Sequence, residues 1–172
     1  MAYARKIRSV YATIVISISA IAAQSAIAAD WWWIDVSGHK PTRDVIFIDK
    51  ETIKKTTIGK VDAWEEDYHE STQNDGAKSS KVLFEYDCNV RTVSMISYID
   101  YDTNGNVISN NTVPSYSRPA SPVAPDTIGE AELEFVCGDA TKGTHLGANL
   151  DIMSVGPGML YVLDHPSPAP KP

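Results

Sequence analysis

The segment from Asp100 to Val107 comes nearest to a metal-binding motif in this chain. Oxygen-bearing side chains recur at alternate positions, a glycine is sixth and an apolar residue is eighth, a spacing typical of the first half of a calcium-binding loop. The twelfth position needs a bidentate glutamate, but Asn111 occupies it. A turn at Asn104-Gly105 between two strands explains the same residues. We therefore predict a hairpin with no metal and no other cofactor; a weak, open calcium site is the alternative.

The histidines do not form an enzymatic motif. They lie in separate segments, at His39, His69, His145 and His165. No nucleophile elbow, HExxH zinc motif or phosphate-binding loop occurs in the sequence. His69 has Asp67 and Glu70 nearby, which are possible zinc ligands, but at the end of a predicted strand in an acidic protein we interpret them as a solvated edge. We predict a protein that is not an enzyme; the least favoured alternative is a hydrolase with a dispersed site, marked by a perturbed acid beside a histidine in a polar pocket.

The two cysteines, Cys88 and Cys137, are the only ones in the sequence. If the domain is exported, as the N-terminal residues described next predict, such a pair in a small domain is expected to form a disulfide bond. Closing a loop of this length contributes about 4 kcal/mol to stability in the chain-entropy model. Two free, buried thiols are the alternative.

The N-terminal 28 residues have the features of a cleaved signal peptide. Basic residues precede an uncharged apolar run at 10–23, and Ala26-Ile27-Ala28 supplies small residues around a cleavage site. The apolar run is shorter than the roughly 20 residues that span a bilayer, and no cysteine is present there to carry a lipid. We therefore predict export to the periplasm or the bacterial cell surface, without a lipid anchor and without stable membrane insertion of the mature chain.

The charge of the mature chain limits its partners. Cleavage after Ala28 removes three of the fifteen basic residues and none of the twenty-two acidic ones, so twelve positive charges remain against twenty-two negative, a net charge of −10. Nucleic acid and anionic membrane surfaces would repel such a protein. A chain of 172 residues is also too short for two domains of ordinary size, so we predict a single globular domain.

The elements that must position these residues are mainly strands. Runs of β-forming residues with two-residue periodicity predict strands at 31–36, 45–48, 60–69, 82–88, 92–99 and 107–110. A polar stretch at 49–55 predicts one helical turn, and four prolines within 114–125 predict a crossing segment. The sequence from Thr127 to Glu130 is a capping box, so a helix should begin there and end at Gly138. Beyond Asp139 we predict irregular chain with two apolar patches and a disordered end.

The order of these elements predicts an α+β fold. We expect a curved antiparallel sheet of about six strands with one C-terminal helix packed on a face and tethered to it by the disulfide. The sequence Trp31-Trp32-Trp33 would place Trp31 and Trp33 on one face of the first strand and Trp32 on the other. Trp32 is then either an exposed interface anchor or covered by the apolar residues 159–162, and we favour the second interpretation.

Several segments resemble a known family of bacterial exported proteins. They are Lys78-Ser79-Ser80-Lys81 leading into Leu83-Phe84-Glu85-Tyr86-Asp87-Cys88, Tyr101-Asp102-Thr103-Asn104-Gly105, Asp126-Thr127-Ile128-Gly129-Glu130-Ala131, and Phe135-Val136-Cys137. In this order they are similar to the surface-adhesin E family, and the likeness runs from about residue 31 to residue 138. The resemblance implies a curved sheet with a helix tethered to its concave side by a disulfide. It also implies adhesion through host extracellular proteins such as vitronectin or laminin.

The resulting hypothesis divides the chain into three parts. Residues 1–28 are the signal peptide, 29–138 a surface-adhesin E-like domain, and 139–172 a C-terminal extension that is partly disordered. The predicted function is that of an exported, non-enzymatic adhesin-like protein that binds host matrix or serum proteins. Because the founding adhesins resemble lipid-anchored proteins and this chain has no cysteine to lipidate, a periplasmic structural or accessory protein without a host ligand is the alternative. The predicted strands neither require nor forbid pairing between subunits.

Overall fold

The structure is a computed structural model that describes residues 28–138 and 140–166. The predicted signal peptide lies outside the described residues except for Ala28, and so does the predicted disordered end from residue 167 onward. Within the described ranges, neither α-helix has the length and apolar character that a bilayer-spanning helix requires.

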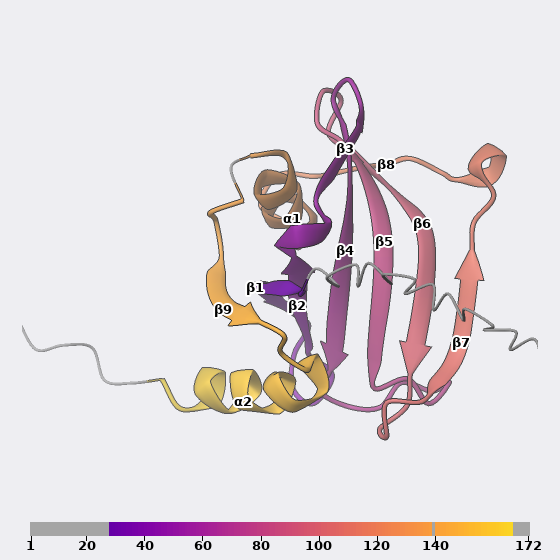
Figure 1. Ribbon diagram of the computed structural model, residues 1–172. Coiled ribbons are helices and arrows are strands. Elements are labelled where there is room, and N and C mark those ends of the chain that lie inside the picture. Colours follow the sequence, from indigo (N-terminus) through magenta and orange to yellow (C-terminus); the bar gives the residue numbers. More distant parts are fainter. Residues whose placement is uncertain (1–27, 139, 167–172) are drawn as a thin grey trace, which may run out of the picture.

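Nine antiparallel strands form one open, curved sheet in the described part of the chain (Figure 1). They are β1 (Asp30–Ser37), β2 (Asp44–Asp49), β3 (Lys54–Thr57), β4 (Lys60–His69), β5 (Ser79–Asp87), β6 (Thr92–Tyr101), β7 (Val107–Thr112), β8 (Ser121–Pro122) and β9 (Thr144–Ala148). Their order is β7-β6-β5-β4-β2-β1-β9, while β3 pairs with β4 and β8 with β6 at the side of this path. The helices are α1 (Ile128–Cys137), α2 (Ile152–Asp164) and the short 3-10 helices η1 (Lys50–Thr52) and η2 (Ser115–Ser117).

The predicted α+β class is confirmed, but the sheet has more than six strands. The strands that the sequence did not predict are β3, β8 and β9. β3 consists of four exposed polar residues and β8 of two exposed residues, so neither shows the alternation of apolar and polar side chains that marks a half-buried strand. β9 pairs with β1 but exposes most of its side chains. Backbone pairing without side-chain burial leaves little signal in a sequence.

Helix α1 begins where the capping box predicted it. The Thr127 hydroxyl accepts a hydrogen bond from the Glu130 N–H, and the Glu130 carboxylate accepts one from the Asp126 N–H. The carboxylate thus reaches one residue further back than in a regular capping box. The helix ends at Gly138, whose N–H donates to the Glu134 carbonyl.

One hydrophobic core lies between α1 and the sheet. Its buried side chains are Ile48, Val61, Ala63, Tyr86, Leu133, Phe135, Val136 and Ala140. A disulfide bond joins Cys88, directly after β5, to Cys137, the last residue of α1, and their Cα atoms are 5.6 Å apart. Helix α1 is therefore held to the sheet by apolar packing and by one covalent bond, as the sequence predicted.

A second hydrophobic core lies under α2. Its buried side chains are Trp31, Val45, Phe47, Tyr68, Ile152 and Leu160. Successive strand residues point to opposite faces, so Phe47 in this core and Ile48 in the first core place the two cores on opposite faces of the sheet. Helix α2 approaches the sheet so closely that a Cβ atom on Gly156 would lie 2.2 Å from the Tyr68 ring.

The irregular chain predicted beyond residue 139 instead contains β9 and α2. Helix α2 was not predicted because its sequence contains Gly-Pro-Gly at 156–158, and both residue types disfavour a helix interior. The Asp151 carboxylate caps the helix by accepting a hydrogen bond from the Met153 N–H. Burial of Ile152 and Leu160 against the sheet then outweighs the unfavourable local propensity.

The three tryptophans of β1 are covered from both sides. Trp31 and Trp33 face the α2 core, as their shared parity predicted. Trp32 faces α1, with its ring centroid 5.5 Å from that of Phe135 and 4.9 Å from that of His145. The prediction that residues 159–162 cover Trp32 is therefore wrong, because α2 lies on the opposite face.

We expect the substitution Cys137→Ser to loosen α1 before it unfolds the strands. The lost cross-link costs about 4 kcal/mol in the chain-entropy model, and a helix of ten residues is marginal when it is detached. The melting temperature should fall, and amide hydrogen exchange should quicken most in residues 127–137 and least in 93–99. Unchanged exchange in α1, or two free thiols in the exported wild-type protein, would contradict this account.

Candidate binding groove

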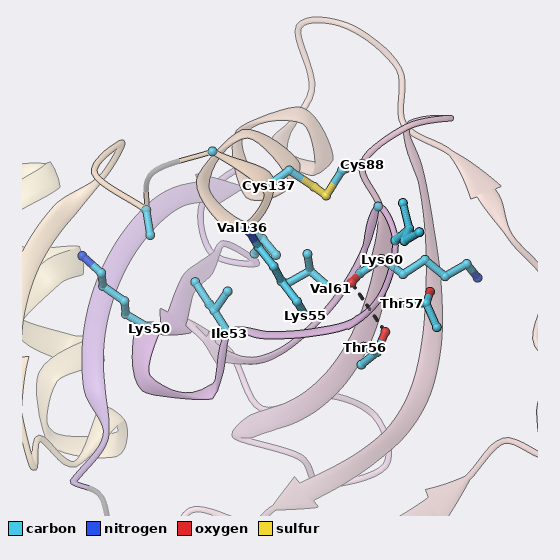
Figure 2. A pocket seen from close by; sticks show the side chains of 14 residues that line it. Lys50, Ile53, Lys55, Thr56, Thr57, Lys60, Val61, Cys88, Val136 and Cys137 are labelled. Carbon is cyan, nitrogen blue, oxygen red and sulfur yellow. Dashed lines mark hydrogen bonds between the residues drawn. A yellow bond between two sulfur atoms is a disulfide. The ribbon is translucent and has the colours of Figure 1, made fainter.

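A groove of about 670 Å³ lies between the β3–β4 hairpin and the C-terminal end of α1 (Figure 2). Its lining comes from three parts of the chain: Lys50 and Ile53 before β3, residues 55–61 of the hairpin, and Cys88, Val136, Cys137, Gly138 and Ala140 around the disulfide. The covalent bond that tethers α1 is therefore also part of the wall of this groove.

The apolar floor of the groove is continuous with the core under α1. Val61 and Val136 are buried members of that core, and Ile53 packs against it. The hairpin turns at Gly59, whose φ is +80° and whose carbonyl accepts a hydrogen bond from the Cys88 N–H at 2.7 Å. The hairpin turn, the end of β5 and the disulfide are thus fixed to one another, so the groove is already formed in the free protein.

Three lysines surround this floor. The Lys50 ammonium lies 4.9 Å from the centroid of the Trp32 ring, a cation–π contact. The Lys60 ammonium lies 2.6 Å from a Glu85 carboxylate oxygen, and this hydrogen bond raises the pKa of Lys60. Lys55 forms no ion pair within the described residues, and Figure 2 shows its side chain reaching across the groove toward α1. A positive rim stands out on a chain of negative net charge.

The hairpin also has an open strand edge. β3 pairs with β4 along one edge, and no strand of the described chain pairs with the other. All four residues of β3 are exposed. At the tip of the hairpin, Ile58 is 98% exposed. The sequence alone did not predict this groove; the signal that it offered was four lysines within residues 50–60 of an acidic chain.

A row of polar side chains crosses four strands at the other end of the sheet. The His69 Nδ1 atom lies 2.7 Å from an Asp44 carboxylate oxygen, and its Nε2 atom lies 3.0 Å from the Ser80 hydroxyl. The Ser80 hydroxyl donates a hydrogen bond of 2.7 Å to the Asp100 carboxylate. His69 is 7% exposed, so the prediction of a solvated edge at this histidine is wrong.

This Asp-His-Ser order resembles a catalytic triad, but its hydrogen bonds suit a structural role. A nucleophilic serine must give its proton to the histidine, whereas Ser80 donates to Asp100. The Ser80 hydroxyl proton is therefore directed at Asp100 and not at the Nε2 atom of His69. Ser80 also lies inside β5, paired with β4 and β6 on its two sides, where sheet hydrogen bonds take up the backbone N–H groups that an oxyanion hole would need.

Three acidic side chains meet between β4 and α1. Burial, followed by the charge of Glu132, raises the pKa of Asp67 to about 7. Burial, followed by the charge of Asp35, raises the pKa of Glu132 to about 7. Burial and the charges of Glu132 and Asp67 raise the pKa of Glu65 well above its usual range. The Tyr86 hydroxyl donates a hydrogen bond of 3.4 Å to Glu65.

The perturbed Asp67 lies close enough to His69 for the histidine charge to lower its pKa. A perturbed acid beside a histidine is half of what a dispersed hydrolase would show, but neither residue lines the groove. Glu70, the third residue of the possible zinc site, instead pairs with Arg43 at 2.7 Å. The remaining histidines lie apart from His69: His145 pairs with Asp30, His165 stacks on Tyr161, and His39 begins the turn before β2.

The calcium-like segment forms the predicted hairpin between β6 and β7. The Asp102 carboxylate accepts hydrogen bonds from the backbone N–H groups of Asn104 and Asn106 and from the Asn106 side chain, and these bonds lower the pKa of Asp102. Gly105 has a φ of +77°, whereas Asn104 is not in the left-handed region. Asp102, the third residue of the calcium-like segment, thus caps its own turn.

Comparison with known protein families identifies the domain. The model of the family described as surface-adhesin protein E matches residues 33–138, more than half of the chain. The chain belongs to the surface-adhesin protein E family. The match includes every residue of the groove except Ala140.

Solved structures of Haemophilus influenzae protein E are similar to this chain at low identity. One crystal form is 13% identical over 54% of this chain and 79% of that chain, with a TM-score of 0.42. A second structure is 12% identical over 64% and 86%, with a TM-score of 0.41. Protein E from non-typeable Haemophilus influenzae is 12% identical over 67% and 82%, with a TM-score of 0.39. No curated protein sequence matches the chain.

The three buried acids predict that the protein is more stable in mild acid than at neutral pH. A carboxyl group whose pKa is raised by folding holds its proton in the folded state while the unfolded chain has lost it, so the free energy of unfolding falls as pH rises between about 4 and 7. We expect Glu132→Gln to remove on the order of 2 kcal/mol of this decrease, measured as melting temperature from pH 4.5 to 8.

The matched control is Glu134→Gln on the same helix. The pKa of Glu134 is lowered by its hydrogen bond to Lys142, so this variant should keep the wild-type slope of melting temperature against pH. Equal slopes in the wild type and in Glu132→Gln would show that the acids under α1 do not titrate as described.

Proposed function

We propose that this chain is an exported, non-enzymatic surface adhesin that attaches to host extracellular matrix or serum proteins. Membership of the surface-adhesin protein E family carries the proposal, because the match covers β2 to β8, most of β1, α1 and nearly all of the groove. The groove supplies what a binding protein needs, namely a preformed apolar surface with a charged rim. Vitronectin and laminin are the first ligands to test.

The predicted export of the protein is consistent with its disulfide bond, which needs an oxidising compartment. The features of a signal peptide in residues 1–28 favour passage out of the cytoplasm. The disulfide between Cys88 and Cys137 is the kind of bond that persists in the periplasm or on the cell surface. A negative net charge keeps the domain away from anionic membranes and nucleic acids.

A non-enzymatic role is favoured by the hydrogen bonding around His69. Its two ring nitrogens are engaged by Asp44 and Ser80, and Ser80 is engaged by Asp100. This row of hydrogen bonds ties together the ends of four strands. We therefore assign these residues to the stability of the sheet.

The second candidate is a periplasmic accessory protein without a host ligand. The observation that favours it is the absence of a cysteine at the predicted cleavage site, where a lipid anchor would attach. Cell fractionation separates the two candidates. Labelling of intact cells by a reagent that cannot cross the outer membrane favours the adhesin, and retention in the periplasm favours the accessory protein.

The adhesin proposal predicts saturable binding of the exported protein to immobilised vitronectin or laminin in a solid-phase assay. Binding should be far above that to albumin, and it should weaken in the Cys137→Ser variant because the groove loses one wall. The proposal would be refuted if the protein showed no saturable binding to any member of a panel of host matrix and serum proteins that includes vitronectin and laminin.

A further inference from the structure

We propose that the groove beside the disulfide takes an extended acidic peptide segment, which pairs with the open edge of β3 and inserts an apolar side chain between the hairpin and α1. This inference rests on the proposed function, because it assigns the binding site and the ligand class of the adhesin. Three features of the groove carry it: an open strand edge, an apolar floor and a positive rim.

The open edge of β3 favours an extended peptide over a helix or a small molecule. β3 is four residues long, pairs with β4 on one side only and exposes all its side chains. Three of its residues, Lys55, Thr56 and Thr57, line the groove. A peptide strand added to such an edge gains backbone hydrogen bonds and places alternate side chains toward the groove.

The floor sets the apolar requirement. Ile53, Val61 and Val136 meet there beside the disulfide, and Figure 2 shows their side chains between the hairpin and α1. These residues are held in place by the core below them. Binding of a ligand side chain therefore costs little free energy for reorganising the site. A branched aliphatic side chain suits a site bordered by such residues.

The rim sets the charge of the ligand. Lys50 and Lys55 border the groove and have no ion pair within the described residues, whereas Lys60 is already neutralised by Glu85. The mature chain is otherwise strongly acidic. A basic peptide would therefore be attracted to other parts of the surface, whereas an acidic peptide is attracted to this rim. The expected ligand therefore alternates carboxylates with aliphatic side chains.

The test uses a fluorescent seven-residue peptide of alternating glutamate and valine, acetylated and amidated, with the exported, disulfide-bonded protein. Fluorescence anisotropy should show saturable binding that weakens as salt is added. Lys55→Gln should weaken binding by about fivefold or more. Lys54→Gln is the matched control, because Lys54 precedes Lys55 in β3, is also exposed and does not line the groove. The affinity of this variant for the peptide should stay within about twofold of the wild type.

Two modified peptides test the mode of binding. The peptide with lysine in place of glutamate should not bind, and the peptide N-methylated at alternate residues should lose binding because it cannot pair with a strand edge. The inference is overturned if the acidic peptide does not bind saturably, if Lys54→Gln and Lys55→Gln weaken binding equally, or if the N-methylated peptide binds as well as the parent.

The same variants separate this inference from the proposed function. If vitronectin or laminin binds the wild type and the Lys55→Gln variant equally, adhesion stands and the groove is not its site. If the peptide binds as described and no host protein does, the groove site stands and the adhesin proposal fails.

Discussion

The middle of the sheet is buried on both faces, and this constraint organises the rest of the molecule. All residues of β2 after the first are buried, and in β4 Ala63 points toward α1 while Tyr68 points toward α2. An antiparallel sheet can leave one face in water. Here each face carries its own hydrophobic core, and each core is shielded from water by one helix. Burial of one large apolar side chain contributes roughly 1.5–3 kcal/mol, so loss of either helix would expose a substantial part of the stabilising surface.

The two covers are held differently, and the difference bears on function. α1 is bonded to the end of β5, and the same bond forms a wall of the groove. α2 is held by packing and by ion pairs at its end, where Asp164 lies 2.9 Å from Arg43. Because the helices cover the centre of the sheet, the margin of a helix is a place where a ligand can reach an apolar core. The groove beside α1 is such a margin, with a strand edge that no other described element uses.

The sequence predicted the elements whose side chains alternate between core and solvent, together with the disulfide and the capped start of α1. It did not predict β3 and β9, which depend on backbone pairing with few buried side chains, or α2, where packing overrides Gly-Pro-Gly at 156–158. The groove was missed for the same reason, since it needs β3 to be placed beside α1. The buried row around His69 joins residues from four strands. Because these residues lie far apart in the sequence, no local motif predicts that they meet.

The most direct test of this two-core account is a comparison of Gly156→Ala with Gly158→Ala. A Cβ atom at Gly156 would overlap the Tyr68 ring, whereas at Gly158 it would meet nothing within 4 Å. The account predicts that Gly156→Ala releases α2, exposes Trp31 and shifts tryptophan fluorescence to longer wavelength, while Gly158→Ala leaves the spectrum unchanged and stabilises the helix by up to about 1 kcal/mol. Identical spectra and melting temperatures for the two variants would contradict the docking of α2 on the second core.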